Sequence, residues 1–265
     1  MTFTTSPSAL VRNGSLPTRF PSLTLLCLFG VLFLYSGCAS QQHAPPSSGS
    51  QAASPSSHAA ELVRASAQAL REMRTLAPEH SLDYWLEEAQ GIILLPGVYQ
   101  AGFFYSIQGG EGVLVARKPD GLWSAPIFMS VGGVGFGIQA GVEKSRMVLV
   151  ITGREALDEI LAHGLHFAVT AKYTMLTIQE VTGPDSLHRN KPVIAVSDGV
   201  GIMAGVALKG GILTRNDSLS AEYYGISAQH TASLLKESRA PGLEVWELWD
   251  ALTVTLPKER IQQPN

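Results

Sequence analysis

The segment that begins at Gly91 constrains the fold of this chain most strongly. It consists of short apolar runs separated by glycines, and it contains no charged residue before Glu111. Glycine at this density is unfavourable in helices, where each one costs about 1 kcal/mol relative to alanine. Short strands bounded by Gly and Pro fit the pattern better. The segment therefore predicts a β-rich core.

Further strands are predicted along the chain from apolar runs, from alternation and from neighbouring turn residues. Met147–Ile151 is apolar at every position, which is typical of a strand buried on both faces. Phe167–Met175 alternates between apolar and more polar residues, as a half-buried strand does. The complete set of predicted strands is Gly91–Pro96, Gly112–Arg117, Met147–Ile151, Phe167–Met175, Val193–Ser197 and Gly205–Leu208, with turns at Gly109-Gly110, Pro119-Asp120-Gly121 and Gly210-Gly211.

Amphipathic helices are predicted on both sides of this core. The first runs from about Ala59 to Ala77 and ends before Pro78, and a shorter one follows over Leu82–Gln90. Thr152-Gly-Arg-Glu155 has the form of a capping box and predicts a helix ending at Gly164. Apolar residues at helical spacing near the C-terminus predict a last helix, with Leu243, Trp246, Trp249 and Leu252 among them. The expected fold class is α+β, with an antiparallel, barrel- or sandwich-like β-rich core flanked by N-terminal and C-terminal amphipathic helices.

The first helix also carries a basic flank. Arg64, Arg71 and Arg74 lie beside its apolar stripe, which includes Leu62, Leu70, Met73 and Leu76. Such a helix can lie at a membrane interface, with its arginines reaching lipid phosphates. It can also pack its apolar stripe on the core of the domain.

Cys38 ends a short apolar run near the N-terminus. Arg12 and Arg19 precede the run, which covers Leu23–Tyr35 and is shorter than the roughly 20 apolar residues that a transmembrane helix needs. The closing segment resembles the lipobox of bacterial lipoproteins, in which the cysteine is acylated and becomes the new N-terminus. Ala39 in the following position implies export to the outer membrane. The alternative is ordinary secretion with cleavage after Ala39.

Composition excludes several classes for the part that follows. Both cysteines, Cys27 and Cys38, lie in the N-terminal segment, so neither a disulfide framework nor a cysteine metal site is possible beyond it. The chain carries 19 Lys and Arg against 22 Asp and Glu, and two of those arginines precede Cys38. Wholesale electrostatic capture by nucleic acid or by anionic lipid is therefore not expected, and any affinity for anionic headgroups must come from a local patch. Residues 40 to 58 are rich in Ser, Pro, Ala and Gln, a composition that predicts a disordered tether spanning roughly 25 Å.

An ordered series of glycine-rich motifs resembles the SYLF domain, also known as the Ysc84-like or Las17-binding actin regulator family. The resemblance covers about residues 82–225. The motifs that carry it are Ala89-Gln-Gly-Ile-Ile-Leu-Leu-Pro-Gly-Val-Tyr-Gln-Ala-Gly102, Gly110-Glu-Gly-Val-Leu114, Trp123-Ser-Ala-Pro-Ile-Phe-Met-Ser-Val-Gly-Gly133, Gly137-Ile-Gln-Ala-Gly141, Gly201-Ile-Met-Ala-Gly-Val-Ala-Leu-Lys-Gly-Gly211 and Tyr224-Gly225.

The resemblance implies phospholipid binding, with phosphorylated inositol lipids as ligands of the eukaryotic members. For a bacterial lipoprotein we expect anionic phospholipids in general, contacted by Arg64, Arg71 and Arg74, and we expect no actin binding. The implied organisation is a lipoprotein signal peptide at 1–37, a disordered tether at 38–58, a lipid-binding domain at 59–255 and a C-terminal tail at 256–265. The expected location is the outer membrane, facing the periplasm.

Enzymatic and cofactor chemistry is not expected. Gly199-Val-Gly201-Ile-Met-Ala-Gly205 has the glycines of a dinucleotide loop, but a strand-like segment follows where a helix is required. His163 and His166 lack neighbours at metal-ligand spacing. Two alternatives to surface lipid binding stay open. One is a structural lipoprotein that docks an envelope protein, and the other is a carrier that holds a lipid inside its β-rich core.

Overall fold

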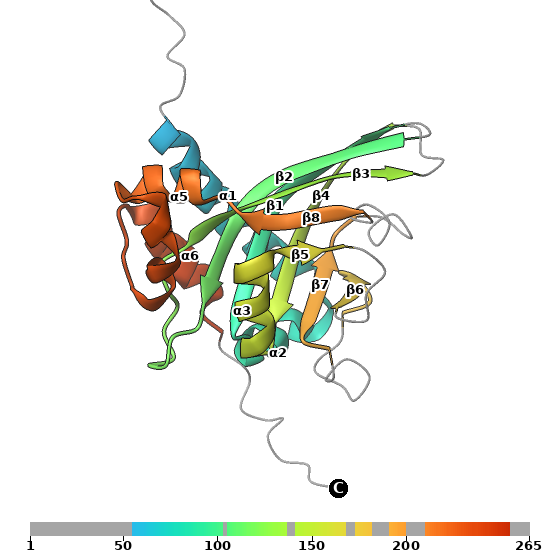
Figure 1. Ribbon diagram of the computed structural model, residues 1–265. Coiled ribbons are helices and arrows are strands. Elements are labelled where there is room, and N and C mark those ends of the chain that lie inside the picture. Colours follow the sequence, from blue (N-terminus) through green and yellow to red (C-terminus); the bar gives the residue numbers. More distant parts are fainter. Residues whose placement is uncertain are drawn as a thin grey trace, which may run out of the picture. The chain divides into compact units, whose positions relative to one another are not determined.

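The computed structural model describes residues 55–102, 105–136, 141–167, 173–181, 191–199 and 210–254 (Figure 1). All of them belong to one compact unit that spans Ser50–Asn265. Cys38, most of the predicted tether, the tail at 256–265 and the predicted strand Gly205–Leu208 lie outside the described residues, as does most of the dinucleotide-like loop.

One sheet of eight strands organises the described part of the chain, in the order β5-β8-β3-β2-β1-β4-β7-β6. Neighbouring strands are antiparallel except β6 and β7, which are parallel. The sheet is curled (Figure 1), and the predicted α+β class with a β-rich core is confirmed. The strands are β1 Gly91–Gly102, β2 Tyr105–Ala116, β3 Ile127–Phe136, β4 Gly141–Ile151, β5 Leu165–His166, β6 Tyr173–Thr177, β7 Val193–Ser197 and β8 Gly211–Arg215.

The central strands are buried on both faces. In β1, Ile92 and Leu94 face one apolar cluster, whereas Ile93 and Leu95 face the other. The run Met147–Ile151 in β4 is buried throughout, as its continuous apolar sequence predicts. The sheet is thus the middle of three layers.

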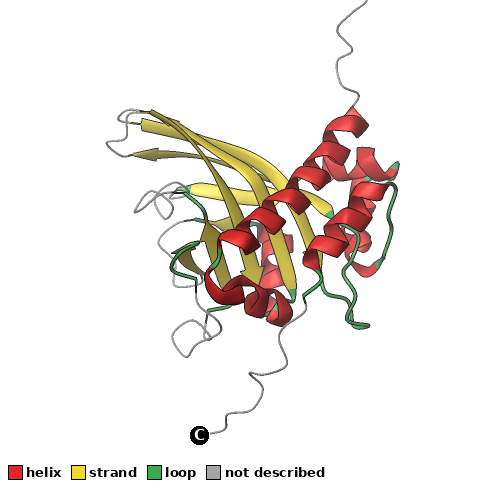
Figure 2. Ribbon diagram, turned by 180° about the vertical axis from the view of Figure 1, so that it is seen from behind, coloured by secondary structure: helices red, strands yellow, loops and turns green. Residues whose placement is uncertain are grey.

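Helices α1 (Pro55–Leu76), α2 (Ser81–Glu88) and α6 (Leu243–Leu252) cover one face, with the short η1 (Pro78–His80) between the first two. Figure 2 shows α1 crossing this face diagonally, with α6 beside it. Helix α1 begins at Pro55, earlier than the start predicted near Ala59. Its predicted apolar stripe is buried except at Leu76, which is half exposed because the helix ends there.

The opposite face is covered by α3 (Arg154–His163), by the end of α5 (Asp217–Tyr224) and by the 3₁₀ helix η2 (Ala228–Lys236). Tyr224 reaches into this core, and its hydroxyl donates to the carbonyl of Pro126 at 2.8 Å. The sequence had not predicted α5 or η2.

A β-bulge in β1 changes the direction of every side chain beyond it. Leu94 pairs with Val113 and Gly97 with Glu111, so β1 uses one residue more than β2 over this interval. The pairing of β1 with β4 shows the same shift. The extra residue lies next to Pro96, which has no backbone N–H to give to the ladder and is tolerated at bulges. As a result β1 continues to Gly102, beyond the end predicted at Pro96.

Two local predictions are wrong. The helix α3 begins after Gly153 without a side-chain cap, because the Thr152 hydroxyl donates to the carbonyls of Lys191 and Pro192 instead, at 3.3 and 3.5 Å. The single strand expected over Phe167–Met175 is also wrong. Phe167 directly follows β5, and Tyr173–Met175 lie in β6, and these two strands are the opposite edges of the sheet. Alternation alone cannot reveal such a break.

Two neighbouring tyrosines make the stability of this fold sensitive to alkaline pH. Burial raises the pKa of Tyr223, whose hydroxyl donates to Glu244 at 2.5 Å, and burial also raises the pKa of Tyr224. Both phenols stay neutral in the folded protein at pH values where they ionise in the unfolded chain, at about 10. Their contribution to the free energy of unfolding is therefore complete below a pH of about 10 and is lost as the pH rises above that value.

We expect the urea midpoint to fall more steeply above pH 10 in the parent protein than in a Tyr223→Phe variant. Removing the hydroxyl also removes the ionisation, so the variant is less stable at neutral pH and less sensitive to alkali. Urea titrations between pH 8 and 11 measure the effect. Tyr105→Phe is the matched control, because that side chain is 70% exposed. An unchanged slope in the Tyr223 variant would contradict the assignment.

Candidate functional site

The outer halves of β1 to β4 extend beyond the helices (Figure 1) and carry a row of exposed apolar side chains. Ala101 pairs with Val142 on one side and with Ile107 on the other, and Ile107 pairs with Val134. Paired residues of antiparallel strands share a face, so these four side chains lie next to one another across four strands. We call Val142, Ala101, Ile107 and Val134 the apolar row.

The row is strongly exposed. Val142 is 79% exposed, Ile107 70% and Val134 67%. Tyr99 and Tyr105 lie on the same face two positions along their strands and are also exposed. Scattered exposed apolar residues are ordinary, but a contiguous set marks a surface that contacts a partner or a membrane.

The polarity of this part of the sheet is inverted. The side chains of Gln100, Ser106 and Gln108 alternate with the apolar row, and they are the buried ones. In an antiparallel sheet with one wet face, the alternation normally places polar residues outward. Apolar side chains on an exposed face do not stabilise the fold. The inversion therefore indicates that the face bearing the apolar row contacts something outside the domain.

A hollow of about 480 Å³ lies at the base of the apolar row, where α1 crosses the sheet. We call it the Lys144 groove. Its floor is formed by Gly97, Gly109 and Gly110, and its polar lining by His58, Glu61, Tyr99, Glu111 and Lys144. The N-terminal turns of α1 form one wall, so the groove adjoins the start of the described chain.

Lys144 and Tyr99 form the side of the groove closest to the row. The Lys144 ammonium lies 5.3 Å from the centre of the Tyr99 ring, and the two residues are register partners. A cation at this distance from an aromatic face is attracted to it. The aliphatic stem of Lys144 leans over Gly97, where a β-carbon would come within 2.9 Å of Lys144 Cε.

Glu111 lies on the other side of Gly97, with which it pairs in register. Its carboxylate contacts His58 Nε2 at 2.9 Å and accepts from the Asn216 side-chain amide at 3.4 Å. Both Glu111 and His58 stay partly exposed at the groove. The groove therefore offers an ammonium and carboxylates on opposite sides of a bare glycine.

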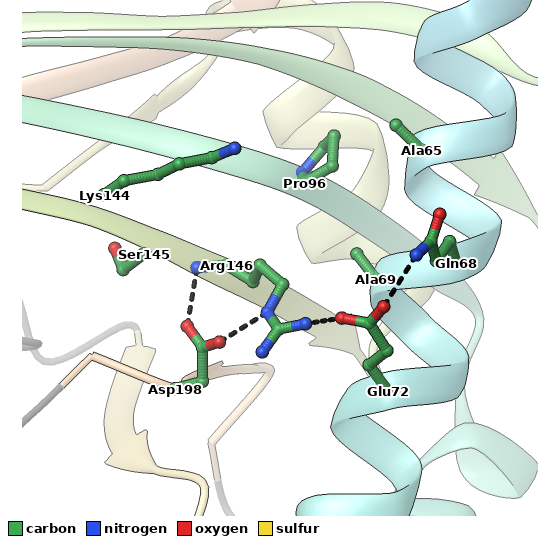
Figure 3. A pocket seen from close by; sticks show the side chains of 9 residues that line it. All are labelled: Ala65, Gln68, Ala69, Glu72, Pro96, Lys144, Ser145, Arg146 and Asp198. Carbon is green, nitrogen blue, oxygen red and sulfur yellow. Dashed lines mark hydrogen bonds and ion pairs between the residues drawn. The ribbon is translucent and has the colours of Figure 1, made fainter.

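A neighbouring hollow, shown in Figure 3, shares Ala65, Pro96 and Lys144 with the groove. Its centre is Arg146 of β4, which forms ion pairs with Glu72 of α1 and with Asp198, the latter at 2.5 Å. Asp198 also accepts from the Arg146 backbone N–H at 2.6 Å. The guanidinium is thus committed to joining α1, β4 and the end of β7.

The three arginines predicted to contact lipid are placed between α1 and α6. Arg64 pairs with Glu244 at 3.4 Å, and Arg71 donates to the carbonyl of Glu247 at 2.8 Å. Arg74 donates to Asp83 at 2.6 Å and to the carbonyl of Ala251 at 2.8 Å. Each guanidinium therefore already has partners within the domain. Lipid contact by these residues stays a prediction.

A third hollow, of about 670 Å³, lies at the other ends of β2 and β3. We call it the tryptophan groove, because Trp123, Trp246 and Trp249 line it. The rings of Trp246 and Trp249 meet edge to face at 5.1 Å, and Arg117 lies 4.2 Å above Trp123. Burial lowers the pKa of Arg117, and the charge of Glu87 partly opposes this.

Some kinds of site have no representative in the described residues. In that part of the chain, no three His, Cys, Asp or Glu side chains gather in a way that could hold a metal ion. Of the helices described there, none has the length and apolar character needed to cross a membrane. Packed side chains fill both faces of the central strands, which favours binding at the surface over storage of a lipid inside the core.

The sequence interpretation missed the apolar row and the Lys144 groove. Pro96 was taken as the end of a strand, so the residues beyond it were not examined as part of one. The signal was available in Tyr99-Gln-Ala101 and Tyr105-Ser-Ile107, which alternate with the period of a strand.

Comparison with known proteins supports the resemblance found in the motifs. Residues 132–255 match the model of the Ysc84 family, described as Las17-binding protein actin regulator. This match begins and ends later than the predicted 82–225. No solved structure gives a significant match.

Several curated relatives are similar over more than half of this chain. A Xenopus laevis protein named SH3 domain-containing YSC84-like protein 1 is 26% identical over 210 residues, which are 76% of this chain and 62% of that protein. The human protein of the same name is 27% identical over 72% of this chain and 58% of its own length. Protein YSC84 of Saccharomyces cerevisiae is 31% identical over 54% of this chain and 31% of its own length. The chain thus spans less than two thirds of each relative.

The arginine contacts predict unequal losses of stability. Arg74→Ala leaves Asp83, which is 4% exposed, with only His80 as an ionic partner, and we expect a loss of roughly 2–3 kcal/mol. Arg64→Ala also leaves a buried carboxylate, Glu244, but this carboxylate keeps the hydrogen bond from Tyr223, and the lost contact is longer. The cost should therefore be about 1 kcal/mol or less. Chemical denaturation of both variants gives the comparison. Equal, small losses would show that the Arg74 contacts do not fasten α1 to α6.

Proposed function

We propose that this chain, whose globular unit carries a domain of the Ysc84 family, is a lipid-anchored, non-enzymatic phospholipid-binding protein of the bacterial cell envelope. In this proposal the acylated residue is Cys38, the anchor lies in the outer membrane and the domain faces the periplasm. The domain then touches the membrane a second time, through the apolar row.

The apolar row is the observation that carries the proposal. Its side chains come from four adjacent strands, so they form a broad, rigid surface that can enter the boundary between headgroups and acyl chains. Tyr99 and Tyr105 flank it on the same face, and tyrosine is enriched at that boundary because its ring is apolar and its hydroxyl is wet. Lys144 supplies a cation beside the row for lipid phosphates.

The energy available from the row is modest. Complete burial of a Val or Ile side chain gives about 1.5–3 kcal/mol, so Ile107, Val134 and Val142 together offer on the order of 5 kcal/mol before the cost of immobilising the domain. Binding through the row alone is therefore weak. An anchor connected to the start of α1 would keep the domain at high local concentration near lipid and would make a weak contact sufficient.

The place where α1 begins supports this arrangement. His58, in its first turns, lines the Lys144 groove at the base of the row. The composition of the 17 residues from Cys38 to Pro55 predicts a flexible tether, for which an average reach of roughly 20–25 Å is expected. In the proposal, this tether lets the acyl chains and the apolar row enter one membrane.

A second candidate function is favoured by the tryptophan groove. Trp246 and Leu122 at this groove are each 61% exposed, and exposed tryptophans are typical of protein interfaces. In this alternative the chain is a scaffolding lipoprotein, and lipid contact is confined to the anchor. A photoreactive residue at position 246 would then capture one discrete envelope protein, whereas the acyl-free domain would not bind vesicles.

Vesicle binding by the acyl-free protein, residues 55–265, tests the main proposal. We expect the triple variant Ile107→Thr, Val134→Thr, Val142→Thr to bind phospholipid vesicles at least about tenfold more weakly, because each hydroxyl lowers the gain from burial. Threonine keeps the β-branched shape, so the strands are preserved. Co-sedimentation with vesicles measures the partition coefficient.

The matched control replaces exposed apolar residues elsewhere, with Leu243→Thr and Leu122→Thr. These substitutions should leave vesicle binding unchanged. An equal loss in the control would place the membrane contact near α6, and binding of the triple variant at the parental level would exclude the apolar row.

The anchor has its own test in the full chain. We expect Cys38→Ala to abolish metabolic labelling with palmitate and to move the protein from the membrane fraction to the soluble fraction. Ordinary secretion makes the opposite forecast, because the parent protein would then be unlabelled and its mature N-terminus would be Ser40. Peptide mapping of the purified protein distinguishes the two.

A further inference from the structure

Along β2, the lining of the Lys144 groove changes from apolar to open and then to acidic. Ile107 belongs to the apolar row, Gly109 lies two positions further in and Glu111 two positions beyond that, all on the face that α1 covers. Each step of two residues advances about 7 Å along a strand. A molecule that follows this line passes from an apolar zone to a bare backbone and then to a carboxylate.

The middle level of this line is open, and the side chain of Lys144 bends from it towards Gly97 at the inner level. Lys144, Tyr99, Gly109 and Gly132 are register partners on four strands. A β-carbon added at Gly132 would meet nothing within 4 Å, and one at Gly109 would meet only a carbonyl oxygen at 3.9 Å. The two glycines therefore leave room for a ligand on this face of the sheet, rather than being required by close packing.

The inner level is acidic. Glu61 of α1 is exposed and lines the groove together with Glu111. His58 and Asn216 also lie at this level, where they contact Glu111 and leave part of its carboxylate exposed. One lysine thus faces two carboxylates, an arrangement that complements a headgroup carrying both an anion and a cation.

We propose that the Lys144 groove recognises a phospholipid headgroup in which a primary ammonium is joined to the phosphate by a short carbon bridge, as in phosphoethanolamine. The phosphate lies beside the ammonium of Lys144, the ammonium of the lipid reaches Glu111 and Glu61, and the acyl chains lie along the apolar row. This inference rests on the proposed membrane contact and names the lipid that the contact selects.

The groove fits this headgroup better than the two principal alternatives. A phosphatidylglycerol headgroup would place its phosphate in the same position, but it offers only neutral hydroxyls to Glu61 and Glu111, and hydrogen bonds to a carboxylate are stronger when the donor is charged. A quaternary ammonium is usually bound among aromatic rings, but Tyr99 is already covered by Lys144. A primary ammonium can donate hydrogen bonds to both carboxylates, and charge-assisted bonds of this kind are the strong ones. The groove therefore departs from the preference for anionic lipid expected from sequence.

Vesicles of three compositions test the proposal with the acyl-free protein: phosphatidylcholine alone, phosphatidylcholine with 40% phosphatidylethanolamine, and phosphatidylcholine with 40% phosphatidylglycerol. We expect the ethanolamine vesicles to bind about threefold to fivefold more strongly than the other two, a ratio in keeping with half-exposed charge pairs. A Glu61→Gln, Glu111→Gln variant should lose this preference while it keeps its binding to phosphatidylcholine.

The control for the two glutamates is Glu88→Gln with Glu247→Gln, which changes the net charge equally at exposed positions outside the groove. Its preference should equal that of the parent. Thermal melting of each variant checks that the fold is intact. Stronger binding of the Glu61, Glu111 variant to phosphatidylglycerol, with no change towards phosphatidylethanolamine, would overturn the proposal.

A soluble headgroup separates failure of the groove from failure of the membrane contact. Glycerophosphoethanolamine should shift the amide resonances of Gly109 and Lys144, whereas glycerophosphoglycerol should not. Shifts without any vesicle binding would keep the headgroup site and overturn the proposed membrane function. Vesicle binding that is equal for all three compositions, without shifts, would keep the membrane function and overturn the headgroup site.

Discussion

The β-bulge beside Pro96 is the constraint on which the rest of this structure depends. A strand has a side-chain period of two, so one extra residue moves every later side chain to the other face. Before the bulge, Ile92 and Leu94 face α1. After it, Tyr99 and Ala101 face that side, and Gln100 faces away. Without the extra residue, Ala101 could not join Ile107 and Val142 in one row.

The same bulge connects two regions with different requirements. On one side of it, β1 and β4 are covered by helices on both faces, and their apolar side chains stabilise the fold. On the other side, the strands continue without helical cover, and their exposed side chains are available for contacts outside the domain. Lys144 and Glu111 lie next to Gly97 in the bulge, where the covered and uncovered parts of the strands meet. The polar groove and the apolar row are therefore adjacent.

Residue patterns predicted the parts of the fold that local physics determines. The buried strand at Met147–Ile151, the amphipathic α1 and the C-terminal helix follow from hydrophobic period and length, and all three are confirmed. The patterns failed where the decisive partner is distant in sequence. The hydroxyl of Thr152 is taken by Pro192, and the alternating stretch from Phe167 is divided between opposite edges of the sheet.

The candidate site was the least predictable part for a related reason. The arginines of α1 look free when the helix is considered alone, because α6, which supplies a partner to each of them, is about 180 residues away. The Lys144 groove combines residues from α1, β1, β2 and β4, and its floor is made of glycines that have no side-chain chemistry. Only the register of the strands shows that those glycines lie between a cation and a carboxylate.

The packing of α1 against α6 also sets an order of events during synthesis. α1 is among the first elements to be made, and α6 is the last described one. The apolar stripe of α1 must therefore wait for nearly the whole domain before its cover is complete, and contacts of such long sequence separation form slowly. The nascent chain would need a chaperone, or early docking of α1 on β1 and β2, to keep that stripe from aggregating.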